Sequence, residues 1–117
     1  PLVDLVHGNA GELNRFAGRE DLEATLRRIT GWGAGAVVVH MGAQGAGYFR
    51  EGRFIVSPAA PVERHRNTAG TGDLLSVCMM LLHGRDDVTS LDRLRLANTI
   101  VAQYIEGRRD FLAPLIL

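Results

Sequence analysis

The sequence contains no lysine: all thirteen basic residues are arginines, and thirteen acidic residues balance them, so the formal net charge of the 117 residues is zero. A chain without excess charge of either sign has no electrostatic reason to bind nucleic acid or an anionic membrane surface. The sequence also lacks an apolar run long enough to span a membrane, and it lacks a signal-peptide pattern. We therefore expect neither a nucleic acid nor a membrane as a partner.

Cysteine is nearly absent as well. The single Cys78 excludes an internal disulfide and fits a reducing compartment, so we expect a cytoplasmic protein. The four histidines have no metal-ligand spacing, which argues against a zinc site. Apolar residues make up 46% of the chain and charged residues 22%, as in ordinary globular proteins. This length and composition predict one domain spanning residues 1–117, with no internal repeat or linker.

Hydrophobic patterns predict alternating strands and helices. An apolar strand, an amphipathic helix and a second apolar strand form a βαβ unit, and a β-hairpin follows. The expected elements are strands at 2–7, 36–41 and 62–65, a hairpin over 48–56, a helical turn at 13–17, and helices at 19–30, 72–83 and 91–105. This order predicts an α/β domain with a mostly parallel sheet and helices on its faces. The apolar residues 111–117 are expected to pack on this domain or on a partner.

The most informative stretch is the glycine-rich segment at residues 67–73, which leads directly into the apolar residues 74–82. Gly70 and Gly72 allow a tight turn and close approach of a ligand to the main chain. The free N–H groups of the following helix then favour an anion, and phosphate is the usual one. Asp73 lies at the mouth of this turn. It is either a helix cap or a proton acceptor beside a bound phosphate.

Three separated motifs carry a resemblance to a known family. They are Asn9-x-x-Glu12 after the first strand, Gly42-x-x-Gly45 before the hairpin, and the glycine-rich segment at 67–73. In this order they resemble the C-terminal portion of the ribokinase-like superfamily, which includes the PfkB carbohydrate kinases and pyridoxal kinase. The resemblance implies the C-terminal part of a ribokinase-like three-layer fold, with a mostly parallel sheet and a β-hairpin.

The resemblance also implies catalytic roles. Asp73 matches the family's catalytic base, which takes the proton from the acceptor hydroxyl. The backbone N–H groups of Gly70, Thr71 and Gly72 match the anion hole that stabilises the transferring phosphoryl group. Phosphoryl transfer needs positioning and electrostatic stabilisation rather than covalent chemistry from the protein, which agrees with these roles.

Binding of the cofactors ATP and Mg²⁺ is implied in the same way. Asn9 and Glu12 match positions that organise Mg²⁺ indirectly, through its waters. Gly42 and Gly45 match the loop that approaches the nucleotide, and Asn98 lies on the helix that walls the adenine pocket. From the residues alone, Asn9 and Glu12 also fit a simple helix start, and the two glycines also fit the entry to a hairpin.

The sequence departs from the family pattern in two respects. Asn67 replaces an Asp that helps hold an activating monovalent cation in several sugar kinases, which argues against potassium activation. The family's N-terminal half, with its acceptor contacts and lid, is not represented. We therefore expect a fragment that lacks the acceptor-binding half, and its truncated sheet predicts a homo-oligomer or association with the missing half.

The function predicted from the sequence is ATP-dependent phosphorylation of a hydroxyl on a sugar or a similar polar acceptor. A pyridoxal-type vitamin kinase is one alternative, because residues 70–74 have the Gly-Thr-Gly-Asp-Leu form. A non-catalytic nucleotide-binding or structural remnant is another. Cys78, Met79 and Met80 are expected in the core. Ser76 has no His or acidic partner nearby in sequence, so we do not expect it to be a nucleophile.

Overall fold

The computed structural model describes residues 2–115 and contains a four-stranded sheet of order β1-β2-β3-β4. The strands are β1 (Val3–Asn9), β2 (Ala34–His40), β3 (Ala46–Arg50) and β4 (Arg53–Ser57). β1 and β2 pair in parallel, whereas β2 with β3 and β3 with β4 pair antiparallel. The α/β class is confirmed. The part of the sheet described here is mixed rather than mostly parallel, because the hairpin contributes both antiparallel pairings.

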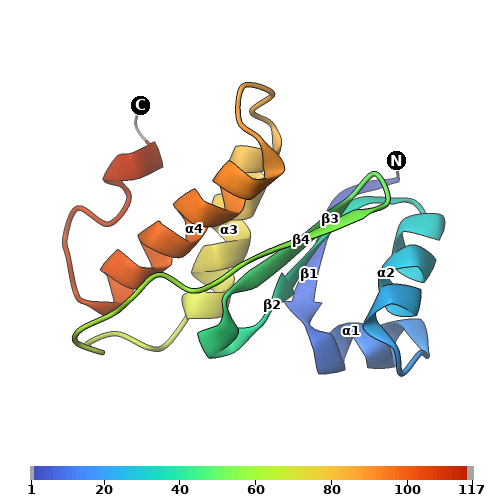
Figure 1. Cartoon of the computed structure of the whole chain (residues 1–117), viewed down its shortest axis with the longest axis horizontal. Coiled ribbons are helices and arrows are strands. Elements are labelled where there is room, and N and C mark those ends of the chain that lie inside the picture. The colour runs from blue at the N-terminus through green and yellow to red at the C-terminus, as the bar shows by residue number, and fades with distance from the viewer. Residues whose placement is uncertain (1, 116–117) are drawn as a thin grey trace.

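Helices cover both faces of this sheet and complete three layers (Figure 1). One face carries α1 (Ala10–Ala17) and α2 (Leu22–Gly31), and the other carries α3 (Thr71–His83) and α4 (Ser90–Ile105). Two short 3₁₀ turns, η1 (Gly42–Gln44) and η2 (Ala113–Leu115), complete the elements. No helix within residues 2–115 is long and apolar enough to cross a membrane.

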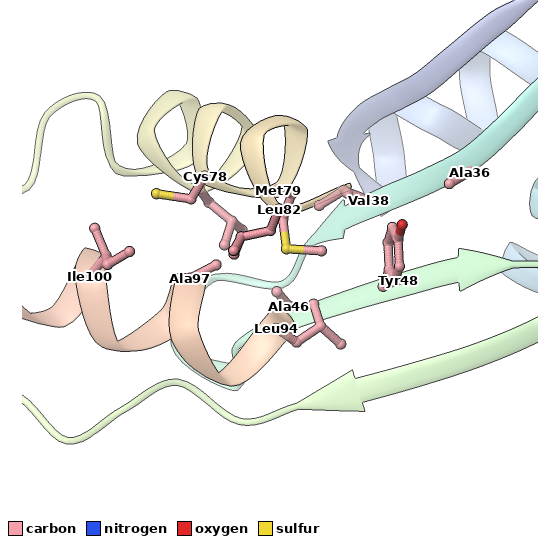
Figure 2. Close-up of a cluster of buried hydrophobic side chains, with 11 residues drawn as sticks. Ala36, Val38, Ala46, Tyr48, Cys78, Met79, Leu82, Leu94, Ala97 and Ile100 are labelled. Atoms are coloured by element: carbon pink, nitrogen blue, oxygen red, sulfur yellow. The ribbon is translucent and has the colours of Figure 1, made fainter. Parts of the chain in front are cut away.

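Alternate residues of β2 build the two halves of the core. Val37 and Val39 pack with the helices α1 and α2, while Ala36 and Val38 pack under α3 and α4. All four are fully buried, as a strand covered on both faces requires. Figure 2 shows the second cluster, where side chains of α3 and α4 face one another and Tyr48 of β3 lies to their right.

Three helices begin at side chains that accept a main-chain hydrogen bond. Asn9 caps α1, Asp21 caps α2 and Thr89 caps α4, each accepting from the N–H three residues later. Residues 89–92 resemble a capping box with Asp in place of Glu, and the side chain of Thr89 does cap α4. α3 differs, because its N-cap is Gly70, a left-handed residue with φ of 78° and no side-chain hydrogen bond.

Two local predictions were wrong. Residues 62–65 form no strand, because the chain leaves the sheet at Ser57 and the amide of Asn98 holds the carbonyls of Ser57 and Pro58. α3 is buried on one side only. Cys78 and Met79 are in the core as expected, but Met80 is 57% exposed.

The exposed side of α3 carries a stripe of large apolar residues. Val77 and Leu81 are 49% and 59% exposed and lie within one turn of Met80 on this helix. β1, at one end of the strand order, has an edge with no partner within residues 2–115. Of the apolar C-terminal residues, Phe111 and Leu115 pack on the core, while residues 116–117 lie outside the described part of the chain.

Candidate functional site

The candidate site lies where the carboxyl ends of β1 and β2 meet the beginning of α3. Because β1 and β2 are parallel, with Asn9 opposite His40, the loops that follow them share one edge of the sheet. Ligands in open α/β sheets bind at this kind of edge. A cavity of about 550 Å³ opens there. Five of the predicted site residues line it: Gly42, Gly45, Thr71, Gly72 and Asn98.

The turn at Gly70, Thr71 and Gly72 has free hydrogen-bond donors. The first helical hydrogen bond of α3 runs from the N–H of Leu74 to the carbonyl of Gly70 at 2.9 Å. The N–H groups of Gly70, Thr71 and Gly72 donate to no acceptor within residues 2–115. Unpaired donors at the positive end of a 13-residue helix form an environment that suits an anion.

Asp73 lies next to these donors and does not cap the helix. It is the third residue of α3, whereas the N-cap position belongs to Gly70. Its carboxylate is exposed and makes no hydrogen bond or ion pair within residues 2–115. The cap alternative is therefore wrong, and the carboxylate is free to meet a ligand beside the turn.

Asn9 and Glu12 satisfy each other at the start of α1. The N–H of Asn9 donates to Oε1 of Glu12 at 2.9 Å, and the N–H of Glu12 donates to Oδ1 of Asn9 at 2.8 Å. This reciprocal capping box is the helix-start alternative considered from the sequence. It leaves the second carboxylate oxygen of Glu12 without a partner among residues 2–115. Neither residue lines the 550 Å³ cavity, but the charge of Glu12 acts on His40 at its wall.

The two glycines after β2 have different surroundings. Gly45 has φ of 106°, and a Cβ there would lie 2.1 Å from the carbonyl oxygen of Ser57, so any side chain would collide with the end of β4. Gly42 has φ of 58° and open space around its Cα. Gly45 is thus required by packing, while Gly42 leaves room for a ligand beside the main chain.

Asn98 is buried, with 7% of its surface exposed, and its side-chain amide donates hydrogen bonds to main-chain carbonyls. Its Nδ2 donates to the carbonyls of Ser57 at 3.1 Å and Pro58 at 3.0 Å. These bonds fix the segment after β4, which lines the same cavity at Ala59, Ala60, Pro61 and Val62. The side chain therefore positions the cavity wall.

Two residues that the sequence analysis did not assign lie under the turn. Nε2 of His40 is 2.8 Å from Oγ of Ser76, and Oγ of Ser76 donates to the carbonyl of Gly72 at 3.0 Å. Because Ser76 donates its hydroxyl proton to Gly72, the hydrogen between Nε2 of His40 and Oγ of Ser76 must come from His40. The imidazole therefore donates to the serine oxygen. Ser76 therefore has a histidine partner, 36 residues away in sequence, but its hydroxyl proton goes to the helix carbonyl.

The surroundings of His40 disfavour the protonated form of its imidazole. Burial lowers its pKa, and the nearby His7, whose ring stacks on it with centroids 5.5 Å apart, lowers it further. The carboxylates of Glu12 and Asp73 act in the opposite direction. Only the position of His40 at the end of a strand, just before a glycine-rich loop, could have drawn attention to it in the sequence.

The end of α4 holds the segment that precedes the turn. Nδ2 of Asn67 donates to the carbonyl of Tyr104 at 3.1 Å, and the hydroxyl of Tyr104 donates to the carbonyl of Ala69 at 2.9 Å. The N–H groups of Arg66 and Asn67 both donate to the carbonyl of Ile105, at 2.7 and 2.9 Å. The turn is therefore fixed from one side by α3 and from the other by α4.

Solved structures that share this fold include a phosphofructokinase, a fructokinase and a ribokinase. Phosphofructokinase-2 from Escherichia coli, in complex with substrates and products, is 26% identical with a TM-score of 0.74, covering 91% of this chain and 36% of that one. Fructokinase from Vibrio cholerae O395, in its fructose-, ADP- and calcium-bound form, is 27% identical with a TM-score of 0.71, covering 89% and 35%. No curated protein matches the chain significantly.

Ribokinase from Arabidopsis thaliana, complexed with ribose and ATP, shares the fold at 20% identity and a TM-score of 0.78, covering 97% of this chain and 40% of that one. The chain thus spans two fifths or less of the length of these relatives. The family model described as pfkB family carbohydrate kinase matches residues 1–105. The ribokinase-like arrangement of strands, loops and helices and this family match agree: the chain belongs to the pfkB family of carbohydrate kinases.

Proposed function

We propose that this chain forms the nucleotide-binding part of an ATP-dependent kinase that phosphorylates a hydroxyl of a sugar or a similar polar acceptor. The observation that carries the proposal is the set of three free N–H groups at Gly70, Thr71 and Gly72 beside the 550 Å³ cavity. The ligands bound in the related structures, fructose and ADP in one and ribose and ATP in another, support the same reaction class.

The cavity has two chemically different sides that suit a nucleotide. The wall formed by Val62, Val101 and Ile105 is apolar and fits the flat face of a base. The opposite side, with Gly42 and the turn before α3, offers main-chain contacts to phosphates. In this arrangement the terminal phosphate of ATP would reach the turn at Thr71 and Gly72, beside which Asp73 lies.

Asp73 then serves as the general base. Its free carboxylate accepts the proton of the acceptor hydroxyl, while the three N–H groups of the turn stabilise the charge that develops on the transferring phosphoryl group. The chain of hydrogen bonds from His40 through Ser76 to Gly72 holds the turn in place from below.

Mg²⁺ would accompany the nucleotide and neutralise part of the phosphate charge. No group of three or more His, Cys, Asp or Glu side chains within residues 2–115 could hold a metal directly. The free carboxylate oxygen of Glu12 and the neighbouring Asn9 fit contact through water, since Mg²⁺ keeps several of its waters. We do not expect a monovalent cation, because Asn67 presents an amide donor to the carbonyl of Tyr104.

The acceptor and further polypeptide complete the site in this proposal. The chain spans two fifths or less of its relatives, and β1 has a free edge beside the apolar stripe on α3. In this proposal another copy or the remainder of a longer chain covers the edge of β1 and the apolar stripe on α3. The proposed kinase is cytoplasmic. The 117 residues alone should phosphorylate no sugar, and detectable turnover would show that the acceptor site is already present.

Nucleotide binding can be tested by calorimetry of the 117-residue chain with ATP and Mg²⁺. Gly42→Asp adds a carboxylate in open space beside the expected phosphates, at a left-handed position that Asp and Asn both tolerate. Gly42→Asn is the matched neutral control. We expect binding to the unsubstituted chain, about tenfold weaker binding to Gly42→Asp, and a smaller loss in the control. Absence of ATP binding, or equal binding to both variants, would refute the proposed site.

A further inference from the structure

A second cavity, of about 310 Å³, lies at the opposite end of the sheet from the nucleotide site. It is formed between the turn of the β3–β4 hairpin and the beginning of α4, which lie far from the first turn of α3 in Figure 1. Its charged and polar lining includes Arg50, Arg53, Arg93, Ser90, Glu51 and Asp86. We call it the arginine cavity.

Arg93 is the buried member of this group. Only 3% of its surface is exposed, and its Nη2 donates to the main-chain carbonyl of Arg85. Its Nε is buried without a hydrogen-bond partner, and no carboxylate within residues 2–115 pairs with it. Burial of a guanidinium with an unsatisfied donor and no ion-pair partner is unfavourable, and the carboxylate of Asp87, which pairs with Arg85, acts on Arg93 only from beyond ion-pair distance. The site therefore lacks an anion that would compensate this charge.

The acidic residues of the arginine cavity do not balance its arginines. Glu51 is 82% exposed at its side chain and approaches Arg50 only to 3.9 Å, which is a weak surface pair. Arg53 and Asp86 make no ion pair within residues 2–115. Three guanidinium groups thus face two carboxylates, and the cavity keeps an excess of positive charge.

The beginning of α4 adds free N–H donors on the same side. Thr89 accepts from the N–H of Asp92 through its hydroxyl at 3.1 Å and from the N–H of Arg93 through its carbonyl at 2.9 Å. The N–H groups of Ser90 and Leu91 donate to no acceptor within residues 2–115. This end of a 16-residue helix carries the positive pole of the helix dipole.

We propose that the arginine cavity binds a phosphate group, either inorganic phosphate or the phosphate of a small metabolite. A tetrahedral oxyanion accepts paired hydrogen bonds from guanidinium groups and from the N–H groups of a helix start. The phosphate would supply the missing charge partner of Arg93. The proposal is independent of the nucleotide site, because the two cavities share no lining residue.

The test is a titration of the isotope-labelled 117-residue chain with inorganic phosphate, followed by NMR at constant ionic strength. We expect shifts of the main-chain N–H signals of Ser90 and Leu91 and of the side-chain Nε–H signal of Arg93. Glycerol 3-phosphate in a parallel titration separates a site for phosphate esters from one for the free ion. Binding of either probe at these signals supports the proposal.

Two sets of variants locate the site without removing Arg93. Arg50→Gln with Arg53→Gln removes two charges, and Ser90→Pro removes one N–H at a first helical position that accepts proline, since Thr89 before it is extended. Each should weaken phosphate binding about tenfold. Arg15→Gln with Arg19→Gln is the control for net charge and should leave binding unchanged.

Three results would overturn the proposal. Phosphate could shift only the signals of the turn at residues 70–73, which belongs to the other site. The Ser90→Pro variant and the double arginine variant could bind as tightly as the control. Acetate at the same ionic strength could shift the Ser90 and Arg93 signals as strongly as phosphate does.

Discussion

The side-chain amide of Asn67 donates a hydrogen bond to the main-chain carbonyl of Tyr104, across 3.1 Å and 37 residues of sequence. It joins the segment before the glycine-rich turn to the last turn of α4. Only a donor can fill this position, because the partner is a carbonyl oxygen. A carboxylate there would face that oxygen without a proton between them, and a cation would be needed to bridge the two.

Replacement of Asn67 by aspartate tests this relationship. The Asn67→Asp variant loses the donated bond and places a negative charge near an oxygen, so we expect a loss of about 1–3 kcal/mol in the free energy of unfolding. Urea denaturation measures it. Thr68→Asp adds the same charge in the same exposed segment without removing a donor, and it should be close to neutral. If potassium, and not choline, restores the free energy of unfolding of the Asn67→Asp variant, a cation bridges the new carboxylate and the carbonyl of Tyr104.

Asp73→Asn tests the proposed role of Asp73 as catalytic base. In a complete kinase that contains these residues, the change should lower kcat by about 10²- to 10⁴-fold, because the amide cannot accept the proton. ATP binding should persist, since the three N–H donors of the turn come from the main chain. Unchanged turnover in this variant would eliminate the base assignment, whereas loss of ATP binding would indicate a structural role for the carboxylate.

Gly45 and Gly42 should respond differently to alanine. A Cβ at Gly45 would lie 2.1 Å from the carbonyl oxygen of Ser57 and 2.6 Å from the nitrogen of Ala59. In Gly42→Ala the new Cβ meets no neighbour, so only the strain of a left-handed alanine lowers the free energy of unfolding, by about 1 kcal/mol. Gly45→Ala adds a collision to a comparable strain, so its loss should be larger, at the upper end of about 1–3 kcal/mol or beyond. Equal melting temperatures would contradict the packing argument.

Stability should fall on the acidic side of neutrality. Burial lowers the pKa of His83, and Arg50 and Arg93 lower it further, against the opposite effect of Asp4. Because the folded protein binds this proton more weakly than the unfolded chain does, stability is constant well above pH 6.5 and decreases as the pH falls through 6.5. His40 contributes in the same direction, since its pKa is lowered as well.

The contact of His83 with Tyr48 gives this prediction a variant. The tyrosine hydroxyl lies 2.6 Å from Nδ1 of His83, which accepts the bond only when neutral. His83→Gln should flatten the dependence of the unfolding midpoint on pH in the range from about 5 to 7. His65→Gln, in an exposed loop, is the control. An unchanged slope in the His83 variant would show that its protonation is not linked to folding.

The apolar stripe on α3 should govern association. Met80→Glu with Leu81→Glu places charge on two side chains that are 57% and 59% exposed, so the fold should tolerate it, within about 0.5 kcal/mol each. Sedimentation velocity should show less association than in the unsubstituted chain. Phe16→Glu makes a similar change at a residue that is 66% exposed in the other helix layer. Equal association in both variants would exclude the stripe as an interface.

The parts of the fold that depend on short stretches could be predicted from the sequence. The apolar run of β2 indicates a strand covered on both faces, and glycines followed by an apolar segment indicate the turn that opens α3. Thr89 three residues before Asp92 indicates the start of α4. Each of these is decided within a few residues, where periodicity and capping chemistry act directly.

The remainder depends on contacts between distant residues. Residues 62–65 have strand-like composition, but Asn98 holds the preceding segment away from the sheet through Ser57 and Pro58, which lie 41 and 40 residues before it. The exposed side of α3 could not be predicted either, because an apolar helix gives no indication of which face lacks a cover. His40 and Ser76 meet only through the packing of α3 on β2, so no local pattern connects them.

The bonds from Tyr104 and Ile105 to residues 66–69 also set an order of events during synthesis. The glycine-rich turn leaves the ribosome about 35 residues before Tyr104 does, as the numbering of Ala69 and Tyr104 gives. Until α4 has emerged and docked, the turn lacks the anchors that fix its first half. If the turn binds nucleotide as proposed, binding should therefore require that α4 has formed and docked.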